Sequence, residues 1–404
     1  MLGSVYIGLS GLMTYSKGLD TISNNVANMN TPGYKRSDLL FRDLFYQQQH
    51  TASGDSGTSN QQIGSGVTGN STTLSFSSGE IKETGNETDM AIDGNGFFIL
   101  KQGTSTFYTR AGQFEFDQSG SLVASGTTAK VMGYSAGSLK EISISGARTN
   151  PAVATSEINF AKNLSTGSTT HELSTVAVID SLGATHNLKI TFTNNNTITP
   201  GSWLIDIEDS SGTSIATGGE IRFQGNGSPE IGFNSYSFTF SPNSVNPSTI
   251  QLNFGTAGAF TGTTSFSSGT TSDLAVGVTD GVAAGALLSV GFNRDGVLQT
   301  TYSNGVTADN SRLALAWFQD LQSLEQLGKS QFAVKDSQLP IISAANEGIM
   351  GSIVGKSIEL SNVDLTLEFT DLIIMQRGFQ GASQILTVSN EMMQQLLSMG
   401  KGGG

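Results

Sequence analysis

Residues 1–30, MLGSVYIGLSGLMTYSKGLDTISNNVANMN, carry an apolar side chain at every seventh position. This row consists of Val5, Leu12, Leu19 and Val26, and a second row three positions after Leu12 consists of Tyr15, Ile22 and Met29. Repeats of this period are typical of coiled-coil helices, so the stretch predicts a helix with an apolar face. Since Pro32 disfavours a helical residue before it and Gly33 supplies a turn, we expect the helix to end at residues 30–33.

The other end of the chain repeats the pattern over a longer span, residues 362–399. One row is Leu365, Leu372, Phe379, Leu386 and Met393, and a second row is Met375, Ala382, Ser389 and Leu396. Ser361 followed by Asp364 resembles a capping box, which predicts the helix start, and Gly400 is placed to end the helix. At about 1.5 Å per residue this helix is about 57 Å long, more than an ordinary globular helix.

Glycines weaken the N-terminal helix. Each glycine costs up to about 1 kcal/mol relative to alanine, so this helix needs packing partners in order to form. The glycines are Gly3, Gly8, Gly11 and Gly18. They also let another backbone approach closely, which suits a core of several helices. The β-rich middle offers no evident partner, so we expect both helical ends to stay exposed and disordered until neighbouring copies bury them.

Between the two ends the apolar period changes from about 3.5 to 2, which predicts strands. The alternating sets are Leu188, Ile190 and Phe192; Leu204, Ile205 and Ile207; Tyr236, Phe238 and Phe240; and Ile250, Leu252 and Phe254. Four turns have Asp or Asn followed three residues later by Gly, at 117–120, 180–183, 209–212 and 293–296. The first side chain stabilises the turn and Gly takes the left-handed position that closes a hairpin. Most of the middle is therefore expected to be antiparallel.

Two stretches predict loops. Segment 46–73, YQQQHTASGDSGTSNQQIGSGVTGNSTT, is polar and rich in Gly and Ser, which predicts a mobile connector or a long loop. Before it, a short amphipathic element is expected from Leu39, Leu40, Phe41, Leu44 and Phe45. Residues 259–275 predict a loop on the return from an outer domain.

Composition limits the class of function. The 404 residues are 37% hydrophobic and only 13% charged, and 50 are glycine, which suits extracellular β-structure with many tight turns. The net charge of −13, with basic residues scattered singly apart from Lys35 and Arg36, argues against nucleic-acid binding. The absence of cysteine excludes disulfides and thiol catalysis. No apolar run approaches a membrane span, and the first residues lack the features of a Sec-type signal peptide, so export by another route is expected.

No group of residues predicts catalysis, a metal or another cofactor. His50, His171 and His186 occur without the paired spacing of a metal site, and no G-x-S-x-G elbow is present. Residues 93–96, DGNG, lack the third glycine and following helix of a nucleotide-binding loop, so they predict a turn between strands. No run supplies the oxygen ligands of a calcium loop. Paired carboxylates for glycoside cleavage leave no local signature, so a polysaccharide-cleaving enzyme stays open without positive support.

Three blocks of sequence carry motifs. The first is NNVAN at 24–28 with TPGYK at 31–35. The second is DMAIDGNGFF at 89–98 with YTRAGQF at 108–114. The third is SNVDL at 361–365 with QRGFQ at 376–380. In this order and spacing the blocks resemble the bacterial flagellar rod, hook and hook-associated protein family, the second block its inner β-domain and the third its C-terminal helix.

The resemblance carries expectations about function. Distal rod proteins of the family are shorter and lack the outer β-domain that residues 150–280 supply here, which favours the hook subunit. This implies a homopolymer, a flexible curved tube that transmits torque from rod to filament, lined by paired terminal helices and surrounded by sliding β-domains. It implies export through the flagellar type III apparatus without a cleaved signal peptide, to the extracellular hook. It also implies contacts with the distal rod protein, the hook cap protein and the hook–filament junction protein.

The expected fold is mainly β with α-helical termini and an out-and-back chain path. Residues 1–33 and 362–404 form a coiled-coil-like helical core, 34–73 a connector, 74–150 and 281–361 an inner antiparallel β-domain, and 151–280 an outer one. Polymer-core packing is assigned to Val5, Leu12, Leu19, Ile22, Val26, Leu365, Leu372, Met375, Phe379, Leu386, Met393 and Leu396. The exit from the core is assigned to Asn24, Asn25, Asn28, Pro32, Gly33 and Tyr34.

One alternative from a different class stays open. It is an extracellular β-rich adhesin or polysaccharide depolymerase, whose helical ends form a closed trimeric stalk. Electron microscopy of the intact protein separates the two hypotheses, since a hook subunit forms tubes and a stalked protein forms discrete trimers.

Overall fold

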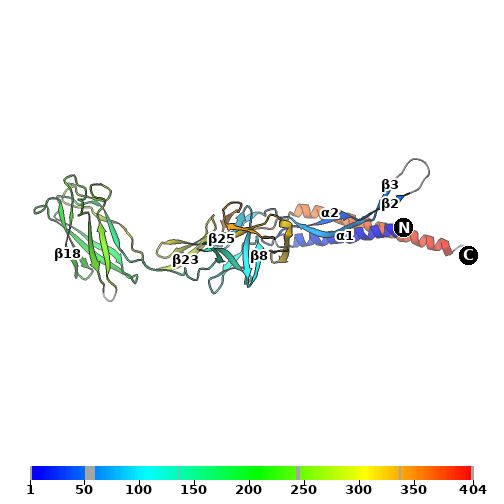
Figure 1. Ribbon diagram of the computed structural model, residues 1–404, viewed down its shortest axis with the longest axis horizontal. Helices are drawn as coiled ribbons and strands as arrows, with labels where there is room; N and C mark the ends of the chain where they lie inside the picture. Colours follow the sequence, from blue (N-terminus) through cyan, green and yellow to red (C-terminus); the bar gives the residue numbers. More distant parts are fainter. Residues whose placement is uncertain (1, 51–59, 136, 243–245, 336–337, 402–404) are drawn as a thin grey trace. The chain divides into compact units, whose positions relative to one another are not determined.

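The computed structural model describes residues 2–50, 60–135, 137–242, 246–335 and 338–401. The chain divides into two compact units. Unit 1 contains residues 1–145, 290–299 and 309–404, and unit 2 contains residues 146–289 and 300–308. Unit 1 therefore holds both ends of the chain, and unit 2 is built from its middle (Figure 1).

Both predicted terminal helices are confirmed as α1, Leu2–Ala27, and α2, Leu365–Lys401. The predicted cap of α2 is wrong. Asp364 lies directly before the first helical residue, and its Oδ1 accepts the backbone N–H two residues on at 2.7 Å, so Asp364 and not Ser361 is the N-cap. The predicted end at Gly400 is also wrong, because the helix continues through that residue to Lys401.

The predicted loop at 46–73 is wrong for its described residues, which form a two-stranded antiparallel ribbon. Strand β1 (Ser37–Asp43) pairs with β4 (Val67–Leu74), and further out β2 (Tyr46–His50) pairs with β3 (Asn60–Gly64). Residues 51–59 of the predicted loop lie outside the described residues. The prediction from composition failed because this ribbon is not stabilised by alternating apolar side chains. Backbone hydrogen bonds between its strands and packing against α1 stabilise it instead.

The rest of unit 1 is a set of sheets, and three strands of the largest one also include residues of unit 2, at 285–289, 300–302 and 307–308. Two short pairs join distant parts of the chain: β5 (Ile81–Glu83) with β30 (Ser357–Glu359), and β6 (Met90–Asp93) with β29 (Ser352–Gly355). The strands of the largest sheet and its edges are β7 (Phe97–Gln102), β8 (Ser105–Thr109), β9 (Phe114–Phe116), β10 (Leu122–Ala124), β11 (Lys130–Ser135), β12 (Ser138–Glu141), β23 (Gly285–Phe292), β24 (Val297–Tyr302), β25 (Thr307–Trp317), β26 (Leu324–Gly328), β27 (Gln331–Val334) and β28 (Ile341–Ala344). A 3₁₀ turn, Leu321–Ser323, precedes β26. The predicted DGNG turn joins β6 to β7.

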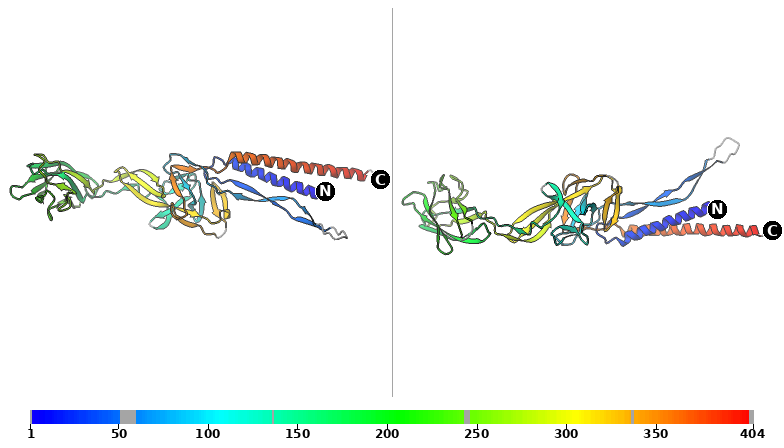
Figure 2. Two further views of the ribbon diagram at one scale, coloured as in Figure 1. Left: turned by 90° about the horizontal axis from the view of Figure 1, so that it is seen from above. Right: turned by 60° about the horizontal axis from the view of Figure 1, so that its bottom comes forward.

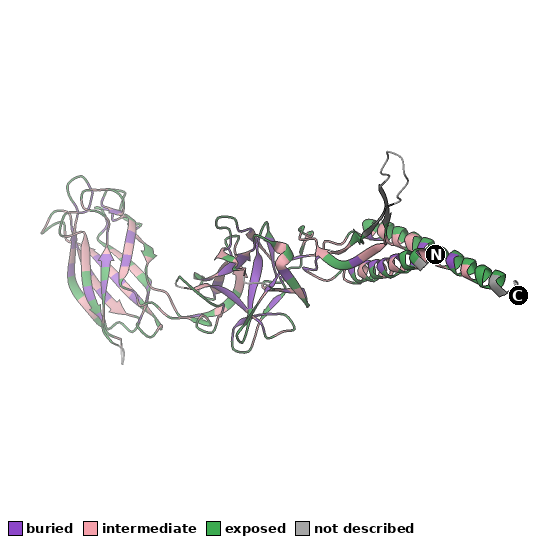
Figure 3. Cartoon of the chain, turned by 45° about the vertical axis from the view of Figure 1, so that its right-hand side comes forward, coloured by how far each residue is buried: buried purple, intermediate pink, exposed green. Residues whose placement is uncertain are grey.

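The core of unit 1 lies on both faces of this sheet. Phe98 and Leu100 of β7 belong to one buried cluster, and Phe97 and Ile99 of the same strand belong to another. Successive strand residues point to opposite faces, so the near-continuous apolar run of β7 fills both clusters. Buried residues concentrate in the sheets, whereas the two helices are largely half-buried or exposed (Figure 3).

Unit 2 contains a sandwich of two sheets around one apolar core. The first sheet runs β15 (Thr170–Ile179), β16 (Thr185–Asn194), β17 (Ser202–Asp209), β18 (Ser214–Arg222), all antiparallel. The second contains β14 (Glu157–Asn163), β19 (Ser235–Phe240), β20 (Ser248–Asn253), β21 (Thr263–Thr264) and β22 (Ala275–Thr279). A short β13 (Thr149–Asn150) pairs with β23. The four predicted alternating sets lie in or directly after β16, β17, β19 and β20.

The four predicted turns are confirmed. In each, the glycine N–H donates to the carbonyl of the Asp or Asn three residues earlier at 2.9–3.0 Å, and the glycine φ lies between 70° and 89°. The oxygen Oδ1 of the leading side chain also accepts the N–H four residues on in every turn. Most pairing is antiparallel as expected, but β14 pairs in parallel with β20 and β21.

Candidate assembly interface

Helices α1 and α2 pack side by side and run in opposite directions (Figures 1 and 2). At one end Ser4 lies 3.5 Å from Ser389 between their hydroxyl oxygens, and at the other Asn25 contacts Glu368. Helix α1 has 26 residues and α2 has 37, so the last turns of α2 extend beyond α1. The two helices therefore cover part of each other within one chain, whereas the expectation was that both ends stay exposed until neighbouring copies bury them.

Glycines make the contact between the two helices. A Cβ at Gly8 would lie 3.2 Å from Leu386, and one at Gly378 would lie 2.4 Å from the ring of Tyr15. A Cβ at Gly18 would lie 2.9 Å from the sulfur of Met375. These glycines weaken each helix alone, but they allow the close approach that holds the pair together.

The residues predicted to pack the polymer core surround this glycine contact. Ile22 is buried, while the others are mostly half-buried. The half-buried set is Val5, Leu12, Leu19, Val26, Leu365, Leu372, Met375, Phe379, Leu386 and Met393. Leu396 lies beyond the end of α1 and keeps 49% of its surface exposed. The antiparallel pair within one chain thus leaves surface on every one of these side chains except Ile22.

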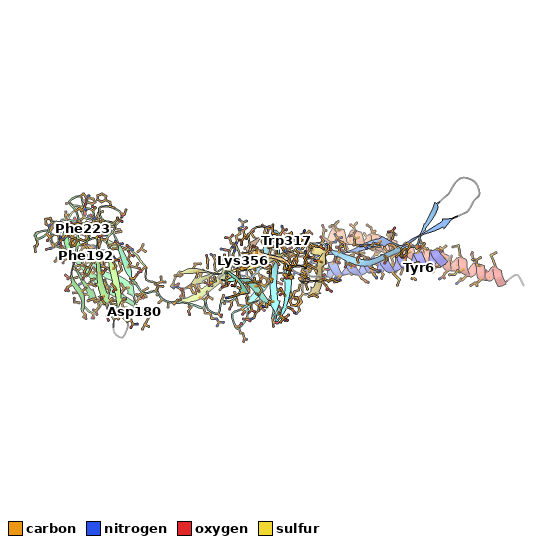
Figure 4. All side chains as sticks on the ribbon, viewed as in Figure 1. Tyr6, Asp180, Phe192, Phe223, Trp317 and Lys356 are labelled. Carbon is orange, nitrogen blue, oxygen red and sulfur yellow. The ribbon has the colours of Figure 1, made fainter. Side chains whose placement is uncertain are left out.

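Both helices expose further apolar residues that the sequence rows did not include. On α2 the exposed row recurs at helical spacing along one face and consists of Leu367, Ile374, Ile385, Val388, Met392 and Met399. On α1 a similar exposed row consists of Tyr6, Leu9 and Met13, and Tyr6 is labelled in Figure 4. We call these two sets the outer rows. Exposed apolar rows of this kind favour an interaction site.

The ribbon covers a second side of α1. Ser10 Oγ accepts the backbone N–H of Val67 at 3.3 Å, and Lys17 Nζ donates to Asn70 Oδ1 at 3.1 Å. The rings of Tyr15 and Phe41 lie 5.6 Å apart between centroids. Helix α1 therefore lies between α2 and the ribbon, with its outer row on the remaining side.

Asn25 is the centre of the junction where α1 ends. Its Nδ2 donates to the Ser37 carbonyl at 2.9 Å and to both carboxylate oxygens of Glu368 at 3.2 and 3.3 Å. Its Oδ1 accepts the hydroxyl of Tyr34 at 3.1 Å and the N–H of Ser37 at 3.0 Å. Asn25 thereby joins α1, the start of β1 and α2, and burial raises the pKa of the Tyr34 hydroxyl.

The other predicted exit residues lie in the last turn of α1 and in the turn that follows it. The Asn28 amide donates to the Asn24 carbonyl at 2.9 Å, and Asn24 Nδ2 donates to the Tyr34 hydroxyl at 3.3 Å. The Pro32 carbonyl accepts the Ser330 hydroxyl at 3.0 Å. Gly33 has φ +65°, and a Cβ there would lie 2.3 Å from the backbone of the 110–111 peptide, so only glycine fits.

A buried carboxylate lies beside this turn. Glu359 Oε1 lies 2.7 Å from Lys35 Nζ, and its Oε2 lies 3.1 Å from the Arg110 guanidinium. Oε1 also accepts the N–H of Gly79 at 2.9 Å. Burial lowers the pKa of Lys35, and the nearby Glu359 opposes that shift. The Gly33 N–H donates to the Glu359 carbonyl at 2.9 Å, so this residue fixes the exit turn through both backbone and side chain.

A second carboxylate, Glu368, is fully buried at the start of α2. Its Oε1 lies 2.7 Å from Arg36 Nε, but the N–H does not point at the oxygen, so the contact is an ion pair and not a hydrogen bond. Arg36 also pairs with Asp38 and Asp371, both at 2.9 Å. Burial raises the pKa of Glu368, and Asp38 and Asp371 add to that rise against the opposing pull of Asn25 and Arg36.

The two buried glutamates were not predicted from the sequence. Glu359 pairs with Lys35 and Arg110 across 324 and 249 positions of the chain, and Glu368 pairs with Asn25 across 343. No local pattern identifies partners so far apart. The one feature of the sequence that could have indicated buried carboxylate partners is the adjacent basic pair Lys35 and Arg36, in a chain with few basic residues.

The described residues contain no cluster of His, Asp and Glu suited to hold a metal. His186 Nε2 lies 2.8 Å from Asp180 Oδ2, and His171 Nε2 lies 2.9 Å from the Leu274 carbonyl, so each contacts a neighbour in unit 2. Within the described ranges, neither helix is long and apolar enough to cross a membrane.

Family models match three parts of the chain. Residues 5–35 match the flagella basal body rod protein model, and residues 91–160 match the flagellar hook protein FlgE/F/G D1 domain. Residues 354–399 match the flagellar basal body rod FlgEFG protein C-terminal model. The first and third matches contain the exit turn, Glu359, Glu368 and most of both helices.

Whole-chain relatives are flagellar hook proteins. The flagellar hook protein FlgE of Treponema pallidum is 30% identical across 99% of this chain and 100% of the relative, and that of Borreliella burgdorferi is 28% identical with the same coverage. The Escherichia coli hook protein is 27% identical across 97% of this chain. A crystal structure of Helicobacter pylori flagellar hook protein FlgE2 aligns with a TM-score of 0.48 and 13% identity over 69% of this chain and all of that one. This chain accordingly belongs to the flagellar hook protein FlgE family and is a structural subunit of the extracellular hook of the bacterial flagellum.

Proposed function

We propose that α1 and α2 form the core of the hook polymer, with the helices of neighbouring copies packing against the outer rows. The single observation that carries the proposal is the exposed apolar face of α2. Helix α1 covers another face of α2, while Leu367, Ile374 and Val388 each keep more than half of their surface exposed. Full burial of a fully exposed side chain of this kind contributes about 1.5 to 3 kcal/mol, and these residues keep about half of that surface to bury, which favours association.

The predicted core residues share that role. Each half-buried side chain of the Val5 and Leu365 rows has surface left for a second helix, as a crowded core requires. The exit residues then fix the direction in which the chain leaves the core. Asn25 and Gly33 support this part of the proposal, since each ties the end of α1 to the region around Glu359 and Glu368.

We propose the following roles for the parts of the chain in the polymer. Residues 1–33 and 362–404 form the core, 34–73 the connector, 74–150 and 281–361 the inner β-domain, and 151–280 the outer β-domain. In the assembled state the polymer is a flexible curved tube that transmits torque. Its further partners are the distal rod protein, the hook cap protein, the hook–filament junction protein and the flagellar type III export apparatus.

Removal of the helices tests the proposal. The intact chain is expected to form tubes under the electron microscope, and the chain trimmed of residues 1–30 and 362–404 is expected to sediment as a monomer. Tubes formed by the trimmed chain would place the polymer contacts in the β-domains and contradict the proposal.

A further inference from the structure

One end of the unit 2 sandwich exposes large apolar side chains on its loops. Ile231, Phe260 and Phe266 keep 79%, 57% and 47% of their surface exposed. The rings of Phe260 and Phe266 stack with centroids 5.9 Å apart and planes 26° from parallel. We call these three residues the tip patch. It lies at the end of the sandwich where Phe223 forms a bridge to Pro229, and Figure 4 labels Phe223 there, with Asp180 toward the other end.

The loops that carry the tip patch are fixed in place. Asn163 holds the backbone of Phe266 at both polar atoms: its Oδ1 accepts the Phe266 N–H at 2.8 Å and its Nδ2 donates to the Phe266 carbonyl at 3.2 Å. The Phe266 ring lies against Gly227, where a Cβ would come within 2.7 Å of it. The Gly258 N–H donates to the Pro229 carbonyl at 2.9 Å, which ties the loop of Phe260 to that of Ile231. A surface ordered in advance loses little conformational entropy on binding.

The loops of the tip patch are almost free of charge. Residues 224–234 and 254–272 contain a single ionisable side chain, Glu230, in a chain whose net charge is −13. Two copies of so acidic a chain repel one another across most of their surfaces. At the tip patch that repulsion is weakest, while the exposed apolar area favours contact.

We propose that the tip patch is a contact surface for a second copy of this chain in the hook polymer. The proposal rests on the proposed assembly only in that the helical core brings the outer domains of different copies together. Contacts in a helical polymer join two different surfaces, so the tip patch meets a different surface of the neighbour rather than its tip patch.

Thiol reactivity tests the contact in the full chain, because the natural sequence has no cysteine. The Phe260→Cys chain is reacted with a maleimide as free subunit and as polymer. The expected result is at least a tenfold slower reaction in the polymer, at low and at high salt alike. An unchanged rate in the polymer overturns the proposal.

A second thiol separates this proposal from the assembly of the core. Met13→Cys lies in the outer row of α1, so it is expected to become protected when tubes form. Protection of Met13→Cys with an unprotected Phe260→Cys leaves the core proposal standing and overturns the tip contact. The reverse result overturns the core proposal and supports the tip contact.

A double variant measures the contribution of the tip patch to assembly. Phe260→Ser with Phe266→Ser is expected to raise the subunit concentration needed for polymer by at least fivefold, with an unchanged circular dichroism spectrum of the free chain. The matched control is Leu182→Ser, a 76% exposed residue in the 180–183 turn of the same sandwich. An equal effect of control and double variant, or no effect of the double variant, overturns the proposal.

Discussion

At the scale of single residues, Glu359 shows how much of the junction depends on one side chain. Its carboxylate is buried between two cations that come from separate segments, Lys35 and Arg110. A buried ion is costly unless partners surround it, so the three charges are stable only as a set. The exit turn after α1 is thereby tied to the strand that leads into α2.

Removing the carboxylate is expected to destabilise unit 1 strongly. Glu359→Ala leaves two buried cations without their common partner, which costs about 3 to 5 kcal/mol in the free energy of unfolding. Each unit contains one tryptophan, Trp317 in unit 1 and Trp203 in unit 2. In a Trp203→Phe background, urea denaturation followed by the fluorescence of Trp317 therefore reports on unit 1.

The control is an ion pair on the surface of the same unit. Lys130 and Glu141 lie 2.6 Å apart, and both are exposed to a third or more of their surface. Exposed pairs contribute little, so Lys130→Ala is expected to leave the urea midpoint almost unchanged. Equal losses in the two variants would mean that Glu359 acts as an ordinary surface group.

At the scale of elements, glycines that lower the helix propensity of α1 and α2 also allow the two helices to pack closely. Gly378 of α2 faces the Tyr15 ring, which also lies 5.6 Å from the Phe41 ring of the ribbon, between centroids, and so has little room to move. Gly381 lies about one turn further along, and a Cβ added there would meet nothing within 4 Å. Gly378 thus has no room for a Cβ, whereas Gly381 has room for one.

Alanine at these two glycines is expected to have opposite effects on the helix pair. Gly381→Ala adds helix propensity and stabilises α2 by up to about 1 kcal/mol. Gly378→Ala gains the same propensity but pushes α1 and α2 apart, so the midpoint of thermal unfolding of the helices falls. Circular dichroism at the helical band measures both, and a stabilising Gly378→Ala would show that the close approach to Tyr15 is not needed.

Glu368 gives the helix pair a dependence on pH. Its pKa is raised above 4.5, so the folded state binds this proton more tightly than the unfolded state. The free energy of unfolding is therefore expected to rise as the pH falls from 7 through the raised pKa, and to level off below 4.5. Glu368→Gln keeps an oxygen for Asn25 but cannot titrate, so its helix stability should lack this component.

The measurement compares Glu368→Gln with the natural chain, because the carboxylates of Asp38 and Asp371 face the same site and are present in both chains. Thermal unfolding of the helices is measured from pH 7 to pH 4.5 for the natural chain and for Glu368→Gln. Glu391→Gln, an exposed position on α2, is expected to follow the natural chain. Parallel curves for Glu368→Gln and the natural chain would contradict the assignment.

The elements also show what could be predicted from sequence. Both helices and the strands around Phe192 and Phe238 follow from periodicity, since a side chain's spacing decides which face it occupies. The paired strands β1 to β4 were not predicted, because their stability comes from backbone pairing and from packing on α1, neither of which leaves an apolar pattern. Asn25 was identified within a motif, whereas its partner Glu368 could be found only once the fold brought the two chain ends together.

At the scale of the whole molecule, family membership and exposed surface point the same way. The hook family is structural, which excludes the alternative of an adhesin or depolymerase. A chain that stayed monomeric would gain nothing from an apolar face along a 37-residue helix. Subunits that bury this face in one another gain that stabilisation only when they assemble.

Polar substitutions in the outer row of α2 should therefore separate folding from assembly. Ile374→Ser with Val388→Ser changes residues that are 57% and 51% exposed, so the free chain is expected to keep its circular dichroism spectrum and its unfolding midpoint. Polymer formation, followed by sedimentation and electron microscopy, is expected to be lost. Ile349→Ser, a 48% exposed residue in a loop of unit 1, serves as the control and should still give tubes. If the double variant polymerises as readily as this control, the outer row does not contact neighbouring copies, and the core must be packed through other faces of the helices.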